Sequence, residues 1–515
     1  MNSISAGDSR ARCRSRFHLF VPRQKYIFLS GRIIDEGHGN RQVVLQSLIS
    51  IEQLFKMNKS TRRGLIGIAV LVCLVALILI LNLERIAPQS AEKCVTLDGS
   101  QSCFSTNPEP YRYYGTKTSY HVAIENNTDL NLPTENCQPK VFYLLSRHAT
   151  RYPDKDWIVP INNVLPTLRE KIISSYTSGN ANFCNEDIEK LKQWGKTMNK
   201  KDDNRLSTTG EMEAENLARR YKEKFPSILT TNYSRYEFEY TSRERTRSTA
   251  EAFAKGLFGE NSKYINFEGK SNDDVLTFHR ACKMYKKNCT DPSYDLSEIE
   301  KFEKGPVMKK MVNSVSKRVG FTLSYEEVEI MYTACVFGYA LNISDIWCSV
   351  FSNDELKVME FEADIDDYYK DAYGNEINYK QACPIAKYIV DLFNSNKNSI
   401  DPKVVLQFSH AGGIKKVYPL FGLFRDEIPL TADAFCEQND RKWRSSLISP
   451  FNSNIAFILY QCPDEHKVAI FHNEKAVQVN GCSSKLCSYK EFSETYEVIG
   501  NRCNIRKLCC TCCSD

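Results

Sequence analysis

Short apolar runs of strand length recur along the chain, each bounded by polar or turn-forming residues. The first, KVFYLLS, is rich in residues that favour buried strands and predicts a strand over residues 140–146. Similar runs predict strands over residues 236–242 and 403–409, and a later pair over residues 454–462 and 467–473. The runs therefore predict a core whose strands come from distant parts of the chain.

Between these runs the apolar positions follow a helical period. Residues 206–226 predict a capped amphipathic helix that ends before its last residue, a proline. Residues 243–259 predict a second helix, which Gly259 ends. Residues 263–395 are charged, tyrosine-rich and mostly helical in period, with few strand runs. The pattern predicts an α/β core interrupted by a largely helical insertion.

One apolar run is too long for a strand. Residues 64–81 form 18 uncharged and nearly all apolar residues, about the minimum that spans a bilayer as a helix. Basic residues precede this run and no net charge follows it, so the rest of the chain is expected in the lumen or outside the cell. We expect a type II membrane protein of the secretory pathway, held in the membrane by this N-terminal helix, or a secreted protein if the anchor is cleaved.

These patterns divide the chain into one large domain and its appendages. The appendages are a cytoplasmic tail over residues 1–63 (or a non-native extension before Met57), a transmembrane signal anchor over 64–83, a stem over 84–135 and a cysteine-rich tail over 501–515. The large domain covers residues 136–500, with its core at about 136–165, 203–262 and 400–500 and a helical cap at about 263–399.

Composition bears on the partners and on the compartment. The formal net charge of +5 is small and no long basic run accompanies it, which argues against nucleic acid as a partner. Twenty cysteines, 18 of them from Cys94 onward, are dense for a reducing compartment and favour disulfides. Four glycosylation sequons agree with the secretory pathway, at Asn126, Asn232, Asn288 and Asn342.

Cysteine spacing suggests two local pairs, Cys282 with Cys289 and Cys482 with Cys487, and leaves the other connectivities open. The run CCTCC over residues 509–513 suits disulfides or crosslinking between tails better than a zinc site. We expect neither a metal nor another cofactor.

The first predicted strand runs into RHATRYP, which places His148 between Arg147 and Arg151. The two positive charges lower the pKa of the histidine and so keep a nitrogen lone pair available. Guanidinium groups bind phosphate oxygens with paired hydrogen bonds, and a neutral imidazole can attack phosphorus to form a phosphohistidine. The alternative is a solvated basic turn with a surface histidine. The spacing favours a phosphate site with a nucleophilic histidine.

The spacing Arg-His-x-x-Arg-x-Pro resembles the signature of the histidine acid phosphatase branch of the histidine phosphatase superfamily. The resemblance runs from about Gln138 to Glu491 and is strongest to a phytase-like group of that branch, the multiple inositol polyphosphate phosphatases. The stretches that carry it are SRERTRSTAEAFAKGLFG, DIWCSVFSNDELKVMEFEADIDDYY, YGNEINYKQACPIAKYI, DEIPLTADAF and SPFNSNIAFILYQC. It implies a three-layer α/β core with a mostly helical cap, and a catalytic turn at the carboxyl ends of the central strands.

The resemblance also implies roles for five residues. His148 is the nucleophile, and Arg147 and Arg151 hold the phosphate. Arg245, in the first turn of its predicted helix, matches the third phosphate-binding arginine, and His410 matches the second active-site histidine, which donates to the phosphate oxygens. Without the resemblance, Arg245 would be taken for an exposed helix residue and His410 for an ordinary core or surface histidine.

Two positions depart from the family pattern. The second histidine is usually followed by Asp, or by Ala-Glu in the inositol polyphosphate group, and this acid protonates the leaving alkoxide. Here Gly412 follows Ala411, so no acid stands at that place. The proton donor is left open: Asp154 or another carboxylate from the cap, His410 itself, or a neighbouring phosphate of the substrate. In the first motif Ala149 replaces the usual glycine, and its methyl group is expected to crowd the loop.

Two functions are compatible with these residues. The leading one is hydrolysis of phosphate monoesters on inositol polyphosphates (inositol hexakisphosphate and lower forms), with 2,3-bisphosphoglycerate as a further substrate by resemblance. The alternative, which Gly412 motivates, is a catalytically weak pseudophosphatase that binds polyphosphorylated ligands. Lys415 and Lys416 either suit a substrate with several phosphates or are solvated helix residues. The retained His148 favours the enzyme.

Overall fold

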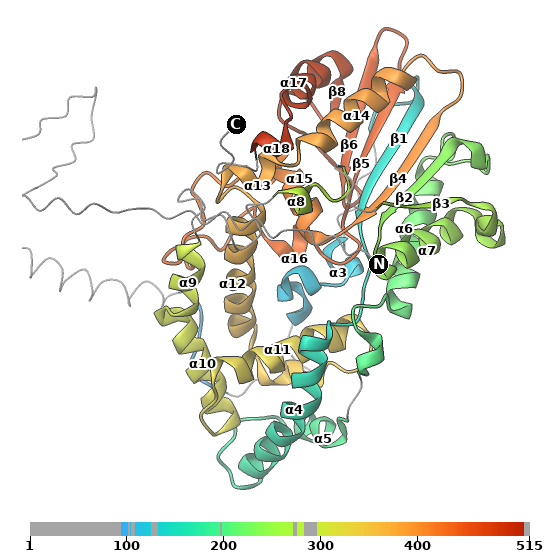
Figure 1. Ribbon diagram of the computed structural model, residues 1–515. Helices are drawn as coiled ribbons and strands as arrows, with labels where there is room; N and C mark the ends of the chain where they lie inside the picture. Colours follow the sequence, from blue (N-terminus) through green and yellow to red (C-terminus); the bar gives the residue numbers. More distant parts are fainter. Residues whose placement is uncertain are drawn as a thin grey trace, which may run out of the picture. The chain divides into compact units, whose positions relative to one another are not determined.

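The computed structural model describes residues 94–100, 103–104, 109–124, 132–195, 198–270, 275–282 and 296–508. Within these ranges a mixed sheet of eight strands runs in the order β3-β2-β4-β1-β5-β6-β7, with β8 paired to β6 (Figure 1). The strands are β1 Gln138–Arg147, β2 Tyr236–Thr241, β3 Phe267–Lys270, β4 Lys403–Ser409, β5 Asn454–Gln461, β6 His466–His472, β7 Lys475–Val477 and β8 Leu486–Ser488. All five predicted strands are confirmed, with only small shifts at their ends.

The two central strands, β1 and β4, are parallel, so their carboxyl ends meet at the same edge of the sheet. Their register pairs Arg147 with Ser409, the last residue of each strand. β2 and β3 continue the parallel part beyond β4, and β5 and β6 add antiparallel strands beyond β1. His148 and His410, the residues that follow β1 and β4, therefore emerge next to each other.

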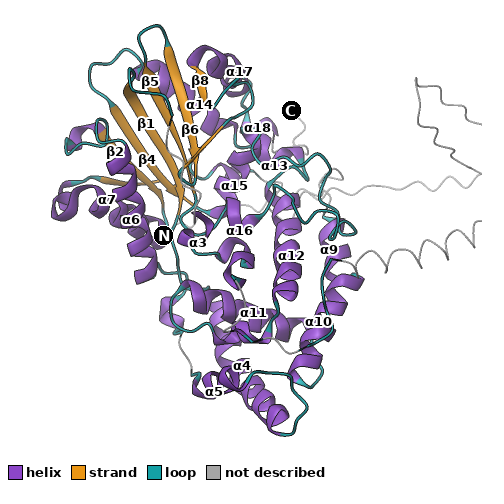
Figure 2. Cartoon of the chain, turned by 180° about the vertical axis from the view of Figure 1, so that it is seen from behind, coloured by secondary structure: helices purple, strands orange, loops and turns teal. Residues whose placement is uncertain are grey.

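Helices cover both faces of the sheet (Figures 1 and 2). The covering helices are α6 Thr208–Lys224 and α7 Glu244–Phe258 on one face, and α14 Cys383–Asn396, α15 Ala411–Leu420 and α17 Tyr489–Asn501 on the other. On β1, Phe142 and Leu144 pack in the cluster with α6 and α7, whereas Tyr143 and Leu145 pack in the cluster with α14, α15 and α17. Successive side chains of a strand point to opposite faces, which accounts for this alternation. The predicted mixed α/β class is confirmed.

Local sequence explains where the predicted helices begin and end. The Ser207 hydroxyl caps α6 by accepting a hydrogen bond of 3.1 Å from the Gly210 N–H. Gly259 ends α7 with a φ of 58°, a backbone conformation that glycine tolerates best. Both signals were readable in the sequence, and both helices start and stop within a few residues of their predicted bounds.

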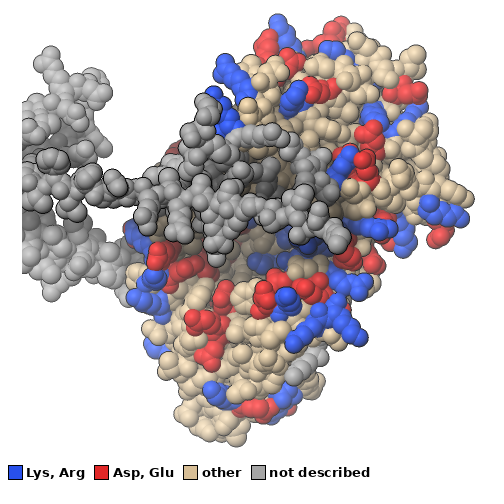
Figure 3. All heavy atoms as spheres, in the orientation of Figure 1, with Lys and Arg blue, Asp and Glu red and all other residues tan. Residues whose placement is uncertain are grey.

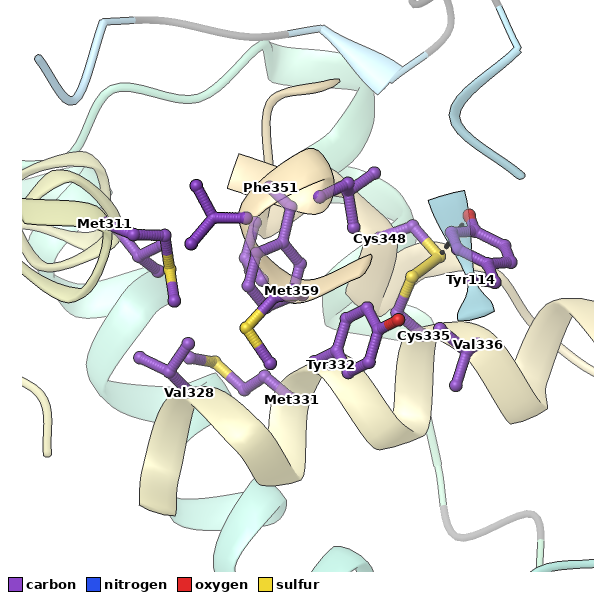
Figure 4. Packing of buried hydrophobic residues seen from close by; sticks show 14 of the residues in the cluster. Tyr114, Met311, Val328, Met331, Tyr332, Cys335, Val336, Cys348, Phe351 and Met359 are labelled. Carbon is purple, nitrogen blue, oxygen red and sulfur yellow. Dashed lines mark hydrogen bonds between the residues drawn. A yellow bond between two sulfur atoms is a disulfide. The ribbon is translucent and has the colours of Figure 1, made fainter. Parts of the chain in front are cut away.

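A second group of helices lies beyond one end of the sheet and builds its own core (Figure 1). It comprises α4 Lys155–Thr177, α5 Asn185–Gln193, α9 Ser297–Glu303, α10 Pro306–Val319, α11 Tyr325–Ala340 and α12 Asn353–Asp371. Figure 4 shows part of this core, which contains Met311, Met331 and Met359 as well as the Cys335–Cys348 disulfide. Shorter helical segments are η3 Gly115–Lys117, α3 Tyr120–Ile124, α8 Phe278–Ala281, α13 Glu376–Lys380, α16 Ser445–Ile448 and α18 Ile505–Leu508.

Two helices lie across the boundary that the sequence predicts between core and cap. The prediction places α14 in the cap, but its Ile385 and Ile389 pack in the same cluster as the strands. It assigns the first half of α4 to the core, but Ile158 and Leu165 pack in the helical cluster. Helical periodicity shows that a helix has an apolar face and does not show which surface that face meets.

No helix within the described ranges is long and apolar enough to cross a membrane. The predicted tail over residues 1–63 and the predicted anchor over 64–83 lie outside the described residues. The cysteines of the CCTCC run at 509–513 lie outside them as well.

Between described residues, four disulfides join segments that are distant in sequence and two close short loops. They pair Cys94 with Cys436, Cys103 with Cys184, Cys137 with Cys462, Cys335 with Cys348, Cys383 with Cys503 and Cys482 with Cys487. The predicted local pair Cys482–Cys487 is thus confirmed. Cys289, the predicted partner of Cys282, lies outside the described residues. This density of disulfides agrees with the oxidising compartment that the cysteine count favours.

Candidate active site

His148 follows β1 directly and is only 3% exposed. Its backbone N–H donates to the carbonyl of Ser409 (3.0 Å), and its carbonyl accepts from the N–H of Asn452 (3.2 Å). Its Nδ1 lies 3.0 Å from the carbonyl oxygen of Ala149, which can only accept a hydrogen bond. Nδ1 therefore carries the ring proton, and Nε2 keeps its lone pair.

The surroundings of His148 keep its ring neutral. Burial lowers its pKa well below the ordinary value, and the nearby charges of Arg147, Arg245, His410 and Arg151 lower it further. A neutral imidazole with one fixed N–H is a nucleophile that needs no prior deprotonation. The depressed pKa inferred from the flanking arginines is confirmed in direction.

Backbone carbonyl groups hold the two arginines of the motif. The Nη1 of Arg147 donates to the carbonyl oxygens of Thr116 (2.6 Å) and Ser449 (2.8 Å), and the Nη1 of Arg151 donates to that of Tyr152 (2.7 Å). The Nε atoms of both arginines are buried and make no hydrogen bond within the described part of the chain. Burial, together with the charge of Arg151, lowers the pKa of Arg147 to about 9. Buried guanidinium groups with donors to spare favour an anion between them.

The other half of the site comes from α7 and from the turn after β4. Arg245 lies in the first turn of α7, and its Nη2 is 3.3 Å from Nδ1 of His410. His410 is the N-cap residue of α15, and its ring centroid lies 5.6 Å from that of His148. The structure thus gathers the five predicted side chains at one edge of the sheet, and we call them the sheet-edge site: Arg147, His148, Arg151, Arg245 and His410.

Two threonine hydroxyls fix the orientation of His410. The Thr246 hydroxyl lies within 2.7 Å of the Thr241 carbonyl and 2.8 Å of the Arg243 carbonyl, so its hydrogen goes to a carbonyl group. Thr241 Oγ1, 2.9 Å away, must then donate to Thr246 Oγ1. It accepts in turn from His410 Nε2, also at 2.9 Å. Nε2 of His410 therefore bears a proton, and Nδ1 is the nitrogen that faces the arginine.

The start of α6 holds the loop that carries the nucleophile. The Ser207 hydroxyl donates to the Thr150 carbonyl (2.8 Å), and Glu213 accepts from the Thr150 N–H (3.1 Å) and hydroxyl (2.8 Å). A Cβ on Gly210 would lie 2.1 Å from the Thr150 carbonyl oxygen, so only glycine allows this approach. Sequence reasoning missed these positioning residues: the pattern predicts a capped helix over residues 206–226 but does not show which loop its residues hold.

Ala149, which replaces the family's usual glycine, does not crowd the loop as expected. Its methyl group packs against Leu206, Ala214 and Ala252 in a small buried cluster. Its N–H donates to the Thr249 hydroxyl (3.2 Å). The extra carbon therefore fills space between the loop and the neighbouring helices.

Gly412 lies in the first turn of α15, close to carboxylates of α12. A Cβ on Gly412 would lie 3.8 Å from both carboxylate oxygens of Asp371. Lys415 pairs with Asp367 and with Asp371, and Lys416 pairs with Asp371. Both lysines are buried, so the alternative that they are solvated helix residues is wrong. Their charges are largely balanced inside the protein.

The remaining sequence candidates are Asp154 and the sequon residues. Asp154 lies near Arg151, whose pKa burial lowers and the charges of Asp154 and Asp203 partly restore. The sequon residues Asn232 and Asn342 are exposed, whereas Asn126 and Asn288 lie outside the described residues. No group of three His, Cys, Asp or Glu side chains in the described ranges is arranged to hold a metal ion. On the face seen in Figure 3, basic and acidic side chains are interspersed and form no continuous basic stripe among the described residues.

Two histidines and three arginines lie together at the carboxyl edge of a mixed α/β sheet, an arrangement that suits phosphate chemistry on an imidazole nucleophile. Comparison with known families agrees with that class of chemistry. The sequence model of the histidine phosphatase superfamily (branch 2) matches residues 140–478, and the chain belongs to this family.

Individual relatives agree with this assignment. The multiple inositol polyphosphate phosphatase 1 of Drosophila melanogaster is 30% identical over 418 residues, which cover 78% of this chain and 88% of that protein. The crystal structure of the phytase from D. castellii has a TM-score of 0.64 at 19% identity and covers 78% of this chain and 87% of that one. The Bifidobacterium longum multiple inositol polyphosphate phosphatase in complex with inositol hexasulfate has a TM-score of 0.56 at 13% identity, covering 75% and 97%.

Proposed function

We propose that the protein removes phosphate groups from inositol polyphosphates through a phosphohistidine formed on His148. The observation that carries this proposal is the contact between His148 Nδ1 and the Ala149 carbonyl oxygen, because it leaves the Nε2 lone pair available among three arginines. The names of the relatives support the substrate class, and so does the inositol hexasulfate bound by the Bifidobacterium longum protein.

The geometry suits a reaction in two steps. Nε2 of His148 attacks phosphorus, the bond to the inositol oxygen breaks, and water later hydrolyses the phosphohistidine. Arg147, Arg151 and Arg245 neutralise the non-bridging oxygens, whose charge must be held in place during both steps. Arg245 and His410 lie at the amino-terminal ends of α7 and α15. The dipoles of these two helices therefore add partial positive charge at the site.

Inositol hexakisphosphate and its lower forms are the substrates we propose, with 2,3-bisphosphoglycerate as a further one. The nucleophile is deeply buried, whereas His410 and Arg245 are only half-buried, so the site opens on their side. A substrate with several phosphates would present one to His148 and leave the others towards that opening.

The direct test uses the purified full-length chain and inositol hexakisphosphate. We expect phosphate release and an acid-labile phosphoenzyme, and we expect His148→Ala to lower phosphate release by at least about 10³-fold while the protein stays folded. The pseudophosphatase alternative predicts a different result: tight binding of the ligand by the unmodified protein with neither phosphate release nor a phosphoenzyme. None of the relatives or described contacts favours that alternative.

We propose further that the domain works in the lumen of the secretory pathway or outside the cell, anchored by the predicted helix over 64–83 or secreted after cleavage. The disulfides and the exposed sequon residues Asn232 and Asn342 support this location. Treatment of the protein from an animal cell line with an N-glycosidase tests it, since the electrophoretic mobility should then increase.

A further inference from the structure

The breaking of an inositol ester leaves an alkoxide, which must be protonated, and no acid follows His410 in the sequence. The structure brings a carboxylate to that place from another helix. A Cβ on Gly412 would lie 3.8 Å from both oxygens of Asp371 on α12. A glutamate carboxylate lies two carbon–carbon bonds beyond its own Cβ, roughly 3 Å. The carboxylate of Asp371 therefore lies at about the distance from position 412 that the carboxylate of a glutamate there would reach.

Asp371 itself is held as an anion. Its Oδ2 lies 2.8 Å from Nζ of Lys415, and its Oδ1 pairs with Lys416. Burial would raise its pKa, but the two ammonium groups outweigh burial and lower it to about 2. Asp371 thus positions its neighbours and does not carry a proton at neutral or mildly acidic pH.

Asp367 lies one turn earlier on the same face of α12 and is in the opposite state. Its Oδ1 pairs with Lys415, whereas its Oδ2 is buried and makes no hydrogen bond to any described residue. The residue as a whole is 9% exposed. Burial and the negative charge of Asp371 raise its pKa to about 6, although Lys415 opposes the shift. Two neighbouring carboxyl groups whose pKa values are shifted in opposite directions are typical of a general acid and its charged partner.

The charge of Asp367 acts on Arg147 of the sheet-edge site. Among the charges near Arg147, that of Asp367 does most to offset the lowering of its pKa by burial and by Arg151. The same holds for Lys117, whose pKa burial lowers and Asp367 partly restores. The groups that face Asp367 are therefore Lys415 from α15, Lys117 from η3, Arg147 from β1, and Asp366 and Asp371 from its own helix.

We propose that Asp367 is the general acid of this site, replacing the acid absent at position 412, with Asp371 and Lys415 as positioning residues. This assignment rests on the phosphatase function proposed above. In the first step Nε2 of His148 forms a bond to phosphorus, the phosphorus–oxygen ester bond breaks with its electron pair on the leaving oxygen, and the Asp367 proton moves to that oxygen. In the second step water attacks phosphorus, its proton returns to Asp367, and the nitrogen–phosphorus electron pair returns to His148.

The leaving group distinguishes this role from a structural one. Inositol alkoxide needs a proton to depart, whereas p-nitrophenolate departs without one. In a single turnover, Asp367→Asn should slow phosphoenzyme formation from inositol hexakisphosphate by about 10² to 10⁴-fold. The burst of p-nitrophenol from p-nitrophenyl phosphate should stay within about threefold of the unmodified protein.

Asp366→Asn is the matched control, one residue away on the same helix. Asp366 is partly exposed and pairs with Lys370. We expect both substrates to react with this variant within about twofold of the unmodified rate. Equal losses on both substrates in Asp367→Asn, or no loss on inositol hexakisphosphate, would overturn the assignment.

A second measurement keeps the inference testable if Asp367→Asn does not fold. On the unmodified protein, phosphoenzyme formation is compared across aryl and alkyl phosphates of increasing leaving-group basicity. A positioned acid makes the rate nearly independent of that basicity, within about tenfold, whereas a steep decline contradicts the presence of any such acid. If the unmodified protein forms no phosphoenzyme from any substrate, the proposed function itself fails, independently of Asp367.

Discussion

Two pairs of largely buried cations lie within a few residues of the active-site histidines, and they differ in their hydrogen-bond partners. One pair is Lys415 and Lys416 on α15, and the other is Arg147 at the end of β1 and Arg151 shortly after it. The lysines of α15 are matched by carboxylates of α12: Lys415 pairs with Asp367 and Asp371, and Lys416 with Asp371. Arg147 and Arg151 donate to backbone carbonyl groups instead, and their buried Nε–H groups have no hydrogen-bond partner in the described ranges.

This difference shows which buried cations are available to bind an anionic substrate. A buried cation that is paired contributes to folding, and its charge is largely cancelled. A buried cation that only touches carbonyl oxygens destabilises the folded protein until an anion arrives. Counting positive residues in the sequence cannot separate these two kinds, because the partners of Lys415 lie on a helix more than 40 residues away.

The largest expected effect comes from removing an uncompensated cation. Arg147→Met should lower kcat/KM for inositol hexakisphosphate by about 10³-fold, because one of the three arginine charges that hold the transferring phosphate is lost. The same substitution should raise the melting temperature in phosphate-free buffer, since it removes a buried charge whose pKa is depressed. Steady-state kinetics and thermal unfolding on the same preparation check both parts. A lowered melting temperature would contradict the comparison.

Removing a compensated cation should have the opposite effect on folding. Lys415→Met leaves Asp367 and Asp371 buried without their shared partner, and we expect the free energy of unfolding at pH 7 to fall by about 3 kcal/mol. Urea unfolding with the disulfides intact measures this. Lys370→Met is the control on the surface of α12, where loss of an exposed pair should cost less than about 1 kcal/mol.

The pH dependence of stability should report on Asp367. Its pKa of about 6 in the folded protein lies above the ordinary value of 3.8, so the native state keeps a proton that the unfolded chain has lost between these values. The free energy of unfolding therefore declines as the pH rises from about 4 to 6. Asp367→Asn should remove this part of the decline, about 2 kcal/mol.

Other ionisable groups do not obscure the contribution of Asp367 to that measurement. Asp364 also has a pKa raised to about 6 by burial, but it is present in both proteins and cancels in their difference. The lowered pKa of Asp371, about 2, gives stability that is lost only as the pH falls below the window. If the free energies of unfolding of the two proteins changed in parallel from pH 4 to 6.5, the raised pKa of Asp367 would be contradicted.

The smallest effect is expected at Gly412. An alanine there would place its Cβ 3.8 Å from the Asp371 oxygens, an ordinary contact distance, so the methyl group fits. Gly412→Ala should change the free energy of unfolding by less than about 1 kcal/mol and leave the kinetics near normal. A large loss would mean that the proximity of α12 excludes any side chain at this position.

Much of the fold could be predicted from the sequence because the strands of the core are apolar runs with clear ends. β4 was predicted to the residue and β1 to within two residues at each end, since both of their faces are buried. The assignment of α14 to the cap failed for a different reason: the pattern shows an apolar face, and only packing shows that this face meets the sheet.

The site divides in the same way. His148, Arg147 and Arg151 lie within five residues, so their local pattern already pointed to phosphate chemistry. Arg245 and His410 were identified only by resemblance, because their roles depend on the neighbouring carboxyl ends of parallel strands. Ser207 and Glu213 were missed, since a polar side chain on a predicted helix does not show which loop it holds.

The hydroxyls of Thr241 and Thr246 give the second histidine a direction. Their hydrogen bonds run from His410 Nε2 inward and end on a backbone carbonyl, a group that cannot pass a proton on. Any proton that His410 exchanges during turnover must therefore cross its outer nitrogen, on the side of the substrate. The two hydroxyls therefore block proton transfer on the inner side of His410. The hydrogen on its inner nitrogen should persist as a slowly exchanging signal in the NMR spectrum, whereas a hydrogen on the outer nitrogen is lost to solvent.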